Sequence, residues 1–201
     1  MPIEHFNQSF ENLGACAGAC LYSTEMLSKI GVFDEHFQTG YEDAELGVRA
    51  VIAGYKCIYE PTAVVCHKMG SSIKKVFNYD YALSIQKKVL YTYFKLMPFG
   101  NLLVNLPFFI FRYVIIILAQ CFLLRFPQAG LMIQALWETL VLERKKININ
   151  RRKFQPMVKL GSLAIAKKQT FFLWNNLQRF YYYFIQRKPS ALDAYGKKEL
   201  T

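Results

Sequence analysis

The sequence has few acidic residues and no cysteine pattern typical of a metal site or a disulfide scaffold. Asp and Glu account for 14 of the 201 residues, against 25 Lys and Arg. The five cysteines are an odd number without a Cys-x-x-Cys pair, so we expect reduced thiols in a cytosolic setting. The first residues, MPIEHFNQSFENLG, lack the charged and apolar regions of a signal peptide, and we therefore expect none.

Charge is unevenly distributed along the chain. Residues 1–70 have four Lys and Arg against nine Asp and Glu, whereas residues 144–201 have fourteen against two, within a total net charge of +11. A basic C-terminal part suits contact with an anionic membrane surface, because each Lys or Arg near lipid headgroups contributes about 1 kcal/mol. No nucleic-acid motif accompanies these basic residues, so we predict no nucleic-acid partner.

A long apolar run covers residues 102–124 and is interrupted by Asn105, Pro107, Arg112 and Gln120. Its Leu, Ile, Val and Phe residues favour bilayer insertion by about 0.3 to 0.6 kcal/mol each, and a central Arg opposes insertion by about 3 kcal/mol. Prolines within and beside the run favour a kinked pair of helices lying in one leaflet. A membrane-spanning helix is the alternative.

Elsewhere, residue spacing and capping patterns predict helices over residues 25–30, 43–53, 73–97, 128–146 and 160–185. Residues 55–67 predict two short strands that join at Glu60 and Pro61.

Residues 33–49, FDEHFQTGYEDAELGVR, place five carboxylates close together. One interpretation is structural: Asp43 and Glu45 stabilise the start of a helix, and Arg49 pairs with Glu45 one turn later. The other is chemical, since a carboxylate at the edge of a cleft is suited to remove a proton from a hydroxyl. These residues alone leave both interpretations open.

Residues 14–72 contain an ordered series of motifs. They are a Gly-Ala-rich start, Leu-Tyr, a short helix ending Ile-Gly, Phe-Asp-Glu, Glu-Asp followed by Glu-Leu, an Arg, Ala-Gly-Tyr, and Val-x-His before Gly and Ser. This order resembles the C-terminal half of the catalytic domain of family-2 glycosyltransferases of the GT-A fold, especially bacterial rhamnosyltransferase-like members. The resemblance implies an α/β, Rossmann-like half-domain over residues 1–72. A mostly helical, membrane-associated region would then cover residues 73–201.

The resemblance also implies a reaction, in which a sugar moves with inversion from a nucleotide-diphosphate donor to a hydroxyl of a lipid-linked glycan. Asp43 would be the general base that removes the proton of the attacking hydroxyl. The acceptor pocket would contain Glu42, Asp34, Tyr41 and Arg49. His67 would help to hold a divalent cation, manganese or magnesium, that neutralises the departing diphosphate.

Two of the features that separate this sequence from those relatives concern the binding of phosphate, metal or nucleotide. Ser23 and Thr24 stand where Arg-Arg is frequent, and the sequence contains no Asp-x-Asp motif, which grips metal and nucleotide in the family. We therefore expect this chain to be inactive alone and to require a separate donor-half polypeptide. We expect it on the cytoplasmic face of the bacterial plasma membrane, in the synthesis of cell-surface polysaccharide. The alternative is a non-catalytic, membrane-associated remnant or interaction protein.

Overall fold

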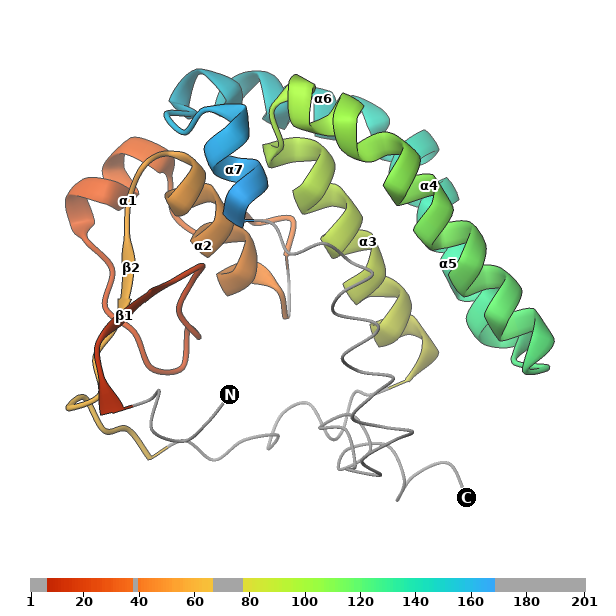
Figure 1. The fold of residues 1–201 in the computed structure, drawn as a ribbon, viewed down its shortest axis with the longest axis horizontal. Helices are drawn as coiled ribbons and strands as arrows, with labels where there is room; N and C mark the ends of the chain where they lie inside the picture. Colours follow the sequence, from red (N-terminus) through yellow and green to blue (C-terminus); the bar gives the residue numbers. More distant parts are fainter. Residues whose placement is uncertain (1–6, 38–39, 67–77, 169–201) are drawn as a thin grey trace. The chain divides into compact units, whose positions relative to one another are not determined.

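The computed structural model describes residues 7–37, 40–66 and 78–168, which are mostly helical (Figure 1). The expected α/β, Rossmann-like half-domain is wrong, because the sheet in the described residues has two strands of three residues each. β1 (Phe10–Asn12) pairs antiparallel with β2 (Cys57–Tyr59), and Glu11 lies opposite Ile58.

The residues next to these strands explain why the sheet is not larger. After β2, the Glu60 carboxylate accepts hydrogen bonds from the Thr62 backbone N–H at 3.1 Å and from its hydroxyl at 2.7 Å. These bonds form a turn where the sequence predicted a second strand in residues 55–67. After β1, the small residues 14–19 have low strand propensity and join no ladder.

α1 (Thr24–Ile30) and α2 (Glu42–Ile52) lie where the sequence predicts helices. The Ser23 hydroxyl accepts the Met26 N–H at 3.2 Å, so α1 begins one residue earlier than predicted. Gly31 ends the helix with φ of 84°, a conformation that glycine adopts without steric cost. The shared core of the two helices contains Met26, Ile30, Leu46 and Ala53.

Two glycines allow the chain after β1 to cross α2 at close range. A Cβ atom at Gly47 would lie 2.6 Å from the Cα of Gly14 and 2.8 Å from the carbonyl oxygen of Leu13. These contacts are with backbone, which cannot rotate away. The crossing places the segment after Gly14 beside the first turn of α2.

α3 (Tyr79–Leu96) lies between α2 on one side and α5 (Phe126–Trp137) and α6 (Arg144–Phe154) on the other (Figure 1). The Asn78 side chain begins α3 by accepting the Tyr81 N–H at 2.9 Å. The second core joins α3 to the next two helices through Leu83, Leu90, Tyr113, Leu131 and Ala135.

α4 (Phe99–Phe122) and α5 pack side by side as a helical hairpin whose loop is residues 123–125 (Figure 1). Pro107 lies inside α4 and does not end it, although it removes one backbone donor. The break comes instead at the loop, where Leu124 has φ of 57°. The hairpin therefore consists of one long helix and one short helix.

After α5, a π-helix, η3 (Glu138–Leu142), leads into α6, and a 3₁₀ turn, η4 (Gln155–Met157), follows it. Residues Met1–Ser162 form one compact unit, and Leu163–Thr201 form a second. The described part of the second unit belongs to α7 (Ser162–Lys168).

Candidate functional site

Arg49 and Asp34, two of the predicted acceptor residues, belong to a buried ion network. Arg49 Nη2 donates to Glu45 Oε2 at 2.7 Å, and the other Glu45 oxygen accepts from Lys95 Nζ at 2.8 Å. Lys95 also donates to Asp34 Oδ2 at 2.7 Å. The Glu45 side chain is fully buried, and those of Arg49 and Lys95 are each 7% exposed. The predicted pair of Glu45 and Arg49 is thereby confirmed.

This network connects three segments that are distant in sequence. Arg49 Nη1 and Nη2 donate to the carbonyl oxygens of Ile30 and Val32, each at 2.7 Å, and so fix the loop after α1 against α2. Lys95 comes from α3 and fixes α2 against it. Sequence reasoning missed Lys95, because a lysine in an amphipathic helix gives no sign of a partner fifty residues away. The network therefore acts as a structural clamp that holds α2 against α3 and against the loop after α1.

Asp43, the predicted general base, lies half-buried in the first turn of α2. Its Oδ1 accepts the Ala44 N–H at 2.7 Å, and its Oδ2 accepts the Ala17 N–H at 3.1 Å. Ala17 belongs to the segment that the Gly14 crossing brings beside α2. The carboxylate is therefore held by one backbone amide on each oxygen.

Glu42 and Tyr41 lie beside Asp43 but have different surroundings. One Glu42 oxygen, Oε2, is buried without a hydrogen-bond partner among the described residues. Its charge attracts Lys88 of α3, while burial lowers the pKa of that lysine. Tyr41 adopts a left-handed conformation with φ of 76°, and burial raises the pKa of its hydroxyl. Both residues are half-buried, and Glu42 interacts electrostatically with Lys88 of α3.

A second charged cluster links α3 to the chain around η3. Lys87 Nζ lies 2.7 Å from Glu138 Oε2 and 3.1 Å from Glu143 Oε1. Glu143 also lies 3.2 Å from Nε2 of His36, and Lys146 Nζ lies 2.7 Å from the other ring nitrogen. The contact with His36, opposed by burial and assisted by Lys87, lowers the pKa of Glu143.

The described residues offer no metal centre. Across residues 7–37, 40–66 and 78–168, no group of three His, Cys, Asp or Glu side chains could hold a metal ion. His67, the predicted metal ligand, lies outside the described residues.

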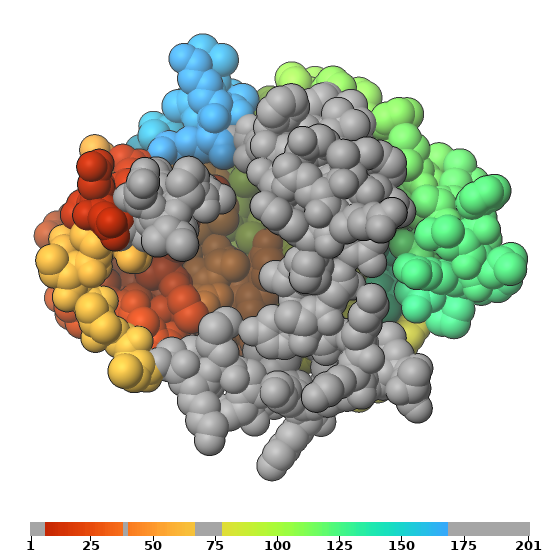
Figure 2. Space-filling view, turned by 60° about the horizontal axis from the view of Figure 1, so that its bottom comes forward, coloured from red at the N-terminus to blue at the C-terminus, as the bar shows by residue number. Residues whose placement is uncertain are grey.

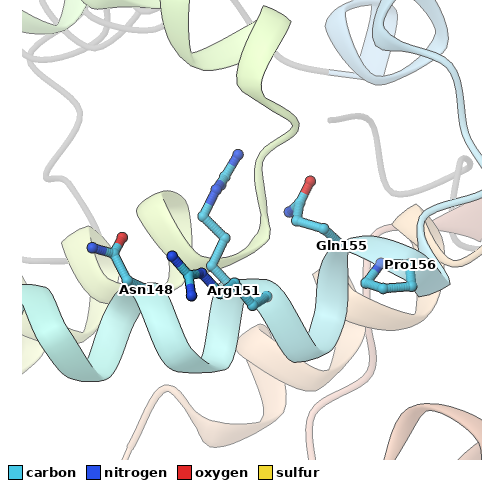
Figure 3. A pocket seen from close by; sticks show the side chains of 5 residues that line it. Asn148, Arg151, Gln155 and Pro156 are labelled. Atoms are coloured by element: carbon cyan, nitrogen blue, oxygen red, sulfur yellow. The ribbon is translucent and has the colours of Figure 1, made fainter.

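A shallow depression of about 520 Å³ lies along α6 (Figure 3). Its lining residues are Asn148, Arg151, Arg152, Gln155 and Pro156. Arg151 donates to the carbonyl oxygens of Phe94 and Met97, and Gln155 donates to that of Leu96 at 3.2 Å. Both side chains therefore satisfy the exposed carbonyls at the end of α3, a role that is structural.

α4 lies in the green part of the surface in Figure 2, and its large exposed side chains are apolar. Its exposed large side chains are Phe99, Leu103, Val104, Leu106, Phe108, Ile110, Phe111, Val114, Ile115, Leu118 and Phe122. All of α4 is described, and Arg112 is the one charged or polar side chain among its exposed residues. α4 is also long and apolar enough to cross a membrane, and 6% of its most apolar 18-residue stretch is buried within the protein.

The neutral polar residues of α4 are buried or half-buried. Asn101 is 5% exposed and donates to the Ser162 carbonyl oxygen at 2.9 Å. Tyr113 is buried against α3 and α5, and Asn105 and Gln120 are half-buried. Helices of water-soluble proteins place apolar residues inward and polar residues outward. α4 shows the reverse arrangement.

Comparison with known proteins adds no relative. The sequence matches no family model, no curated protein and no solved structure. The glycosyltransferase resemblance therefore stays a prediction.

Proposed function

We propose that this chain is a membrane-associated protein whose α4–α5 hairpin enters the lipid bilayer. One observation carries the proposal: α4 exposes a continuous apolar surface and, apart from Arg112, keeps its polar residues buried or half-buried. An apolar patch of this kind on a folded unit marks a surface that another apolar phase covers.

An energy comparison favours insertion. The exposed Leu, Ile, Val and Phe residues of α4 after Phe99 number ten, and at about 0.3 to 0.6 kcal/mol each they favour lipid by about 3 to 6 kcal/mol. A single Arg112 opposes by about 3 kcal/mol if it is held at the bilayer centre and by less near the surface. With Arg112 at the bilayer centre the balance therefore ranges from about zero to about 3 kcal/mol in favour of insertion, and it becomes more favourable as Arg112 approaches the surface.

The basic helix α6 indicates which face of the membrane the protein contacts. Its cations are Arg144, Lys145, Lys146, Arg151, Arg152 and Lys153, and it contains no acidic residue. Because each basic residue near anionic headgroups contributes about 1 kcal/mol, α6 strengthens binding to an anionic leaflet. Basic segments beside membrane helices stay on the cytoplasmic side, so we place the protein on the cytoplasmic face of the bacterial plasma membrane.

Vesicle flotation tests the proposal. We expect the chain to float with vesicles that contain phosphatidylglycerol. Phe111→Asp with Leu118→Asp should lower the bound fraction at least tenfold, since each buried Asp costs about 2.5 to 3.5 kcal/mol. The matched control is Leu21→Asp with Val64→Asp. These residues lie outside the hairpin and are 101% and 86% exposed. Equal binding by parent and hairpin variant would overturn the proposal.

A second candidate is the sugar transfer that the resemblance implies. It is favoured by Asp43, whose oxygens are each held by one backbone amide and keep further lone pairs to accept the proton of a hydroxyl. A nucleotide-diphosphate sugar, a glycan acceptor, a divalent cation and a separate donor-binding polypeptide would complete the reaction. Transfer measured in that mixture should be lost in Asp43→Asn, and full activity of the variant would remove Asp43 from this role.

A further inference from the structure

Arg112 has a distinctive position on α4. On a helix that turns about 100° per residue, the exposed apolar stripe that includes Leu103, Phe111 and Phe122 centres near Leu118. Arg112 lies about 120° from that centre and within about 20° of Asn105. The arginine is therefore at the edge of the apolar surface, on the polar side of the helix, where it remains exposed.

Two orientations of the hairpin give Arg112 different surroundings. α4 has 24 residues and is about 36 Å long, and Arg112 lies about 20 Å from its first residue. An upright hairpin would place Arg112 near the middle of a hydrocarbon core that is about 30 Å thick. A hairpin parallel to the membrane, with Leu118 pointing into the lipid, would place Arg112 above the helix axis on the water side.

The neighbours of α5 favour the parallel orientation. α5 has 12 residues, so the ion pair of Lys87 and Glu138 lies about 18 Å from the hairpin loop. Upright insertion through the core would carry this pair into hydrocarbon. Tyr79 donates to Gln134 at 3.1 Å, about 12 Å from the loop, so the exposed Asp80 beside Tyr79 would enter as well.

The hairpin loop gives a third reason. Arg125 is exposed between Leu124 and Phe126, which are 75% and 61% exposed. In an upright hairpin this charge would lead the insertion and cross the core first. In a parallel hairpin it stays within reach of the headgroups, because long basic side chains extend towards water from an interfacial position.

We propose that the α4–α5 hairpin lies parallel to the membrane in one leaflet, with the outer stripe of α4 in the acyl chains and Arg112 bound to phospholipid phosphates. This inference rests on the proposed membrane association. A guanidinium group suits the contact, because its planar fork of donors pairs with two phosphate oxygens at once.

Label depth in vesicles tests the orientation. The full chain, with its five cysteines changed to serine, would receive Leu118→Cys or Leu124→Cys and a fluorophore at that cysteine. We expect shallow and similar depths for both labels, measured by nitroxides at set positions on lipid chains. A Leu124 label that lies much deeper, or that reacts with dithionite trapped inside the vesicles, would overturn the parallel orientation. Failure of the unlabelled parent chain to float would instead overturn membrane association itself.

Replacing Arg112 gives an independent test, because the two orientations predict opposite changes in vesicle binding. In the parallel orientation, Arg112→Gln should weaken binding to phosphatidylglycerol vesicles about fivefold, because a phosphate contact is lost. In the upright orientation, the same change removes a buried charge and should strengthen binding. The control is Lys29→Gln, on the exposed face of α1, which should leave binding unchanged. Unchanged or stronger binding of Arg112→Gln would overturn the phosphate contact.

Discussion

α2 and α4 both turn polar residues inward, but their outward sides differ. In α2 the inward residues Glu45 and Arg49 are charged and paired, and no large apolar side chain of the helix is exposed. In α4 the inward residues are neutral, and large apolar side chains cover the outside. The first pattern fits a helix surrounded by protein and water, and the second fits a helix with lipid on one side.

Because of this difference, we expect lipid to change the free-energy contribution of α4 but not that of the α2 ion network. The ion network of α2 is internal to the folded unit, so its contribution to stability should be the same with and without vesicles. The apolar surface of α4 gains free energy only when lipid is present. Stability measured with and without vesicles should therefore distinguish mutations in α2 from mutations in α4.

The largest effect is expected from Lys95→Ala. Removing this cation leaves the Glu45 carboxylate fully buried without one of its two charged partners and deprives Asp34 of its ion pair. Breaking a buried ion pair costs about 3 to 5 kcal/mol. Urea unfolding followed by circular dichroism should show this loss equally in buffer and with vesicles.

The comparison for that variant is Lys29→Ala, which removes an exposed pair with Glu25 one turn away on α1. Such surface pairs contribute little, and we expect no measurable change in unfolding. A Lys95→Ala protein as stable as Lys29→Ala would show that the network does not clamp α2 to α3.

A smaller effect with opposite signs in the two regions is expected from glycine substitutions. Gly47→Ala forces a methyl group against the backbone of Gly14 and should destabilise the fold by about 1 to 3 kcal/mol. Gly130→Ala in α5 meets no atom within 4 Å and should stabilise the helix by about 0.5 to 1 kcal/mol. Thermal unfolding of both variants would measure the two shifts, and equal shifts would contradict the close crossing at Gly47.

Local patterns predicted much of the helical structure. The predicted ranges 25–30 and 43–53 lie within one residue of α1 and α2, because capping and spacing act over a few residues. The pair of Glu45 and Arg49 also follows from its spacing.

Long-range features could not be predicted in the same way. The sheet was overestimated because a strand needs a partner, and β2 finds its partner in β1, more than forty residues earlier. Lys95 joins the network across fifty residues, which no local pattern reveals. For the same reason, the sequence did not show that Arg49 and Asp34 face the interior.

The smallest effect is a change in the pH dependence of stability through Asp34. Burial alone would raise the pKa of Asp34, but hydrogen bonds from Lys95 and from the His36 backbone N–H outweigh burial and lower it. A carboxyl with a lowered pKa in the folded state stabilises the fold above its unfolded pKa, near 4, and loses this contribution as the pH falls through the folded value. Asp34→Asn should therefore reduce the acid-induced loss of stability below about pH 4, by at most about 1.4 kcal/mol per pH unit. Unfolding free energies measured from pH 3 to pH 7 would show this as a flatter curve for the variant. An unchanged pH dependence of stability below about pH 4 would mean that the Lys95 contact does not favour the charged Asp34 carboxylate. The ion network would then no longer distinguish the surroundings of α2 from those of α4.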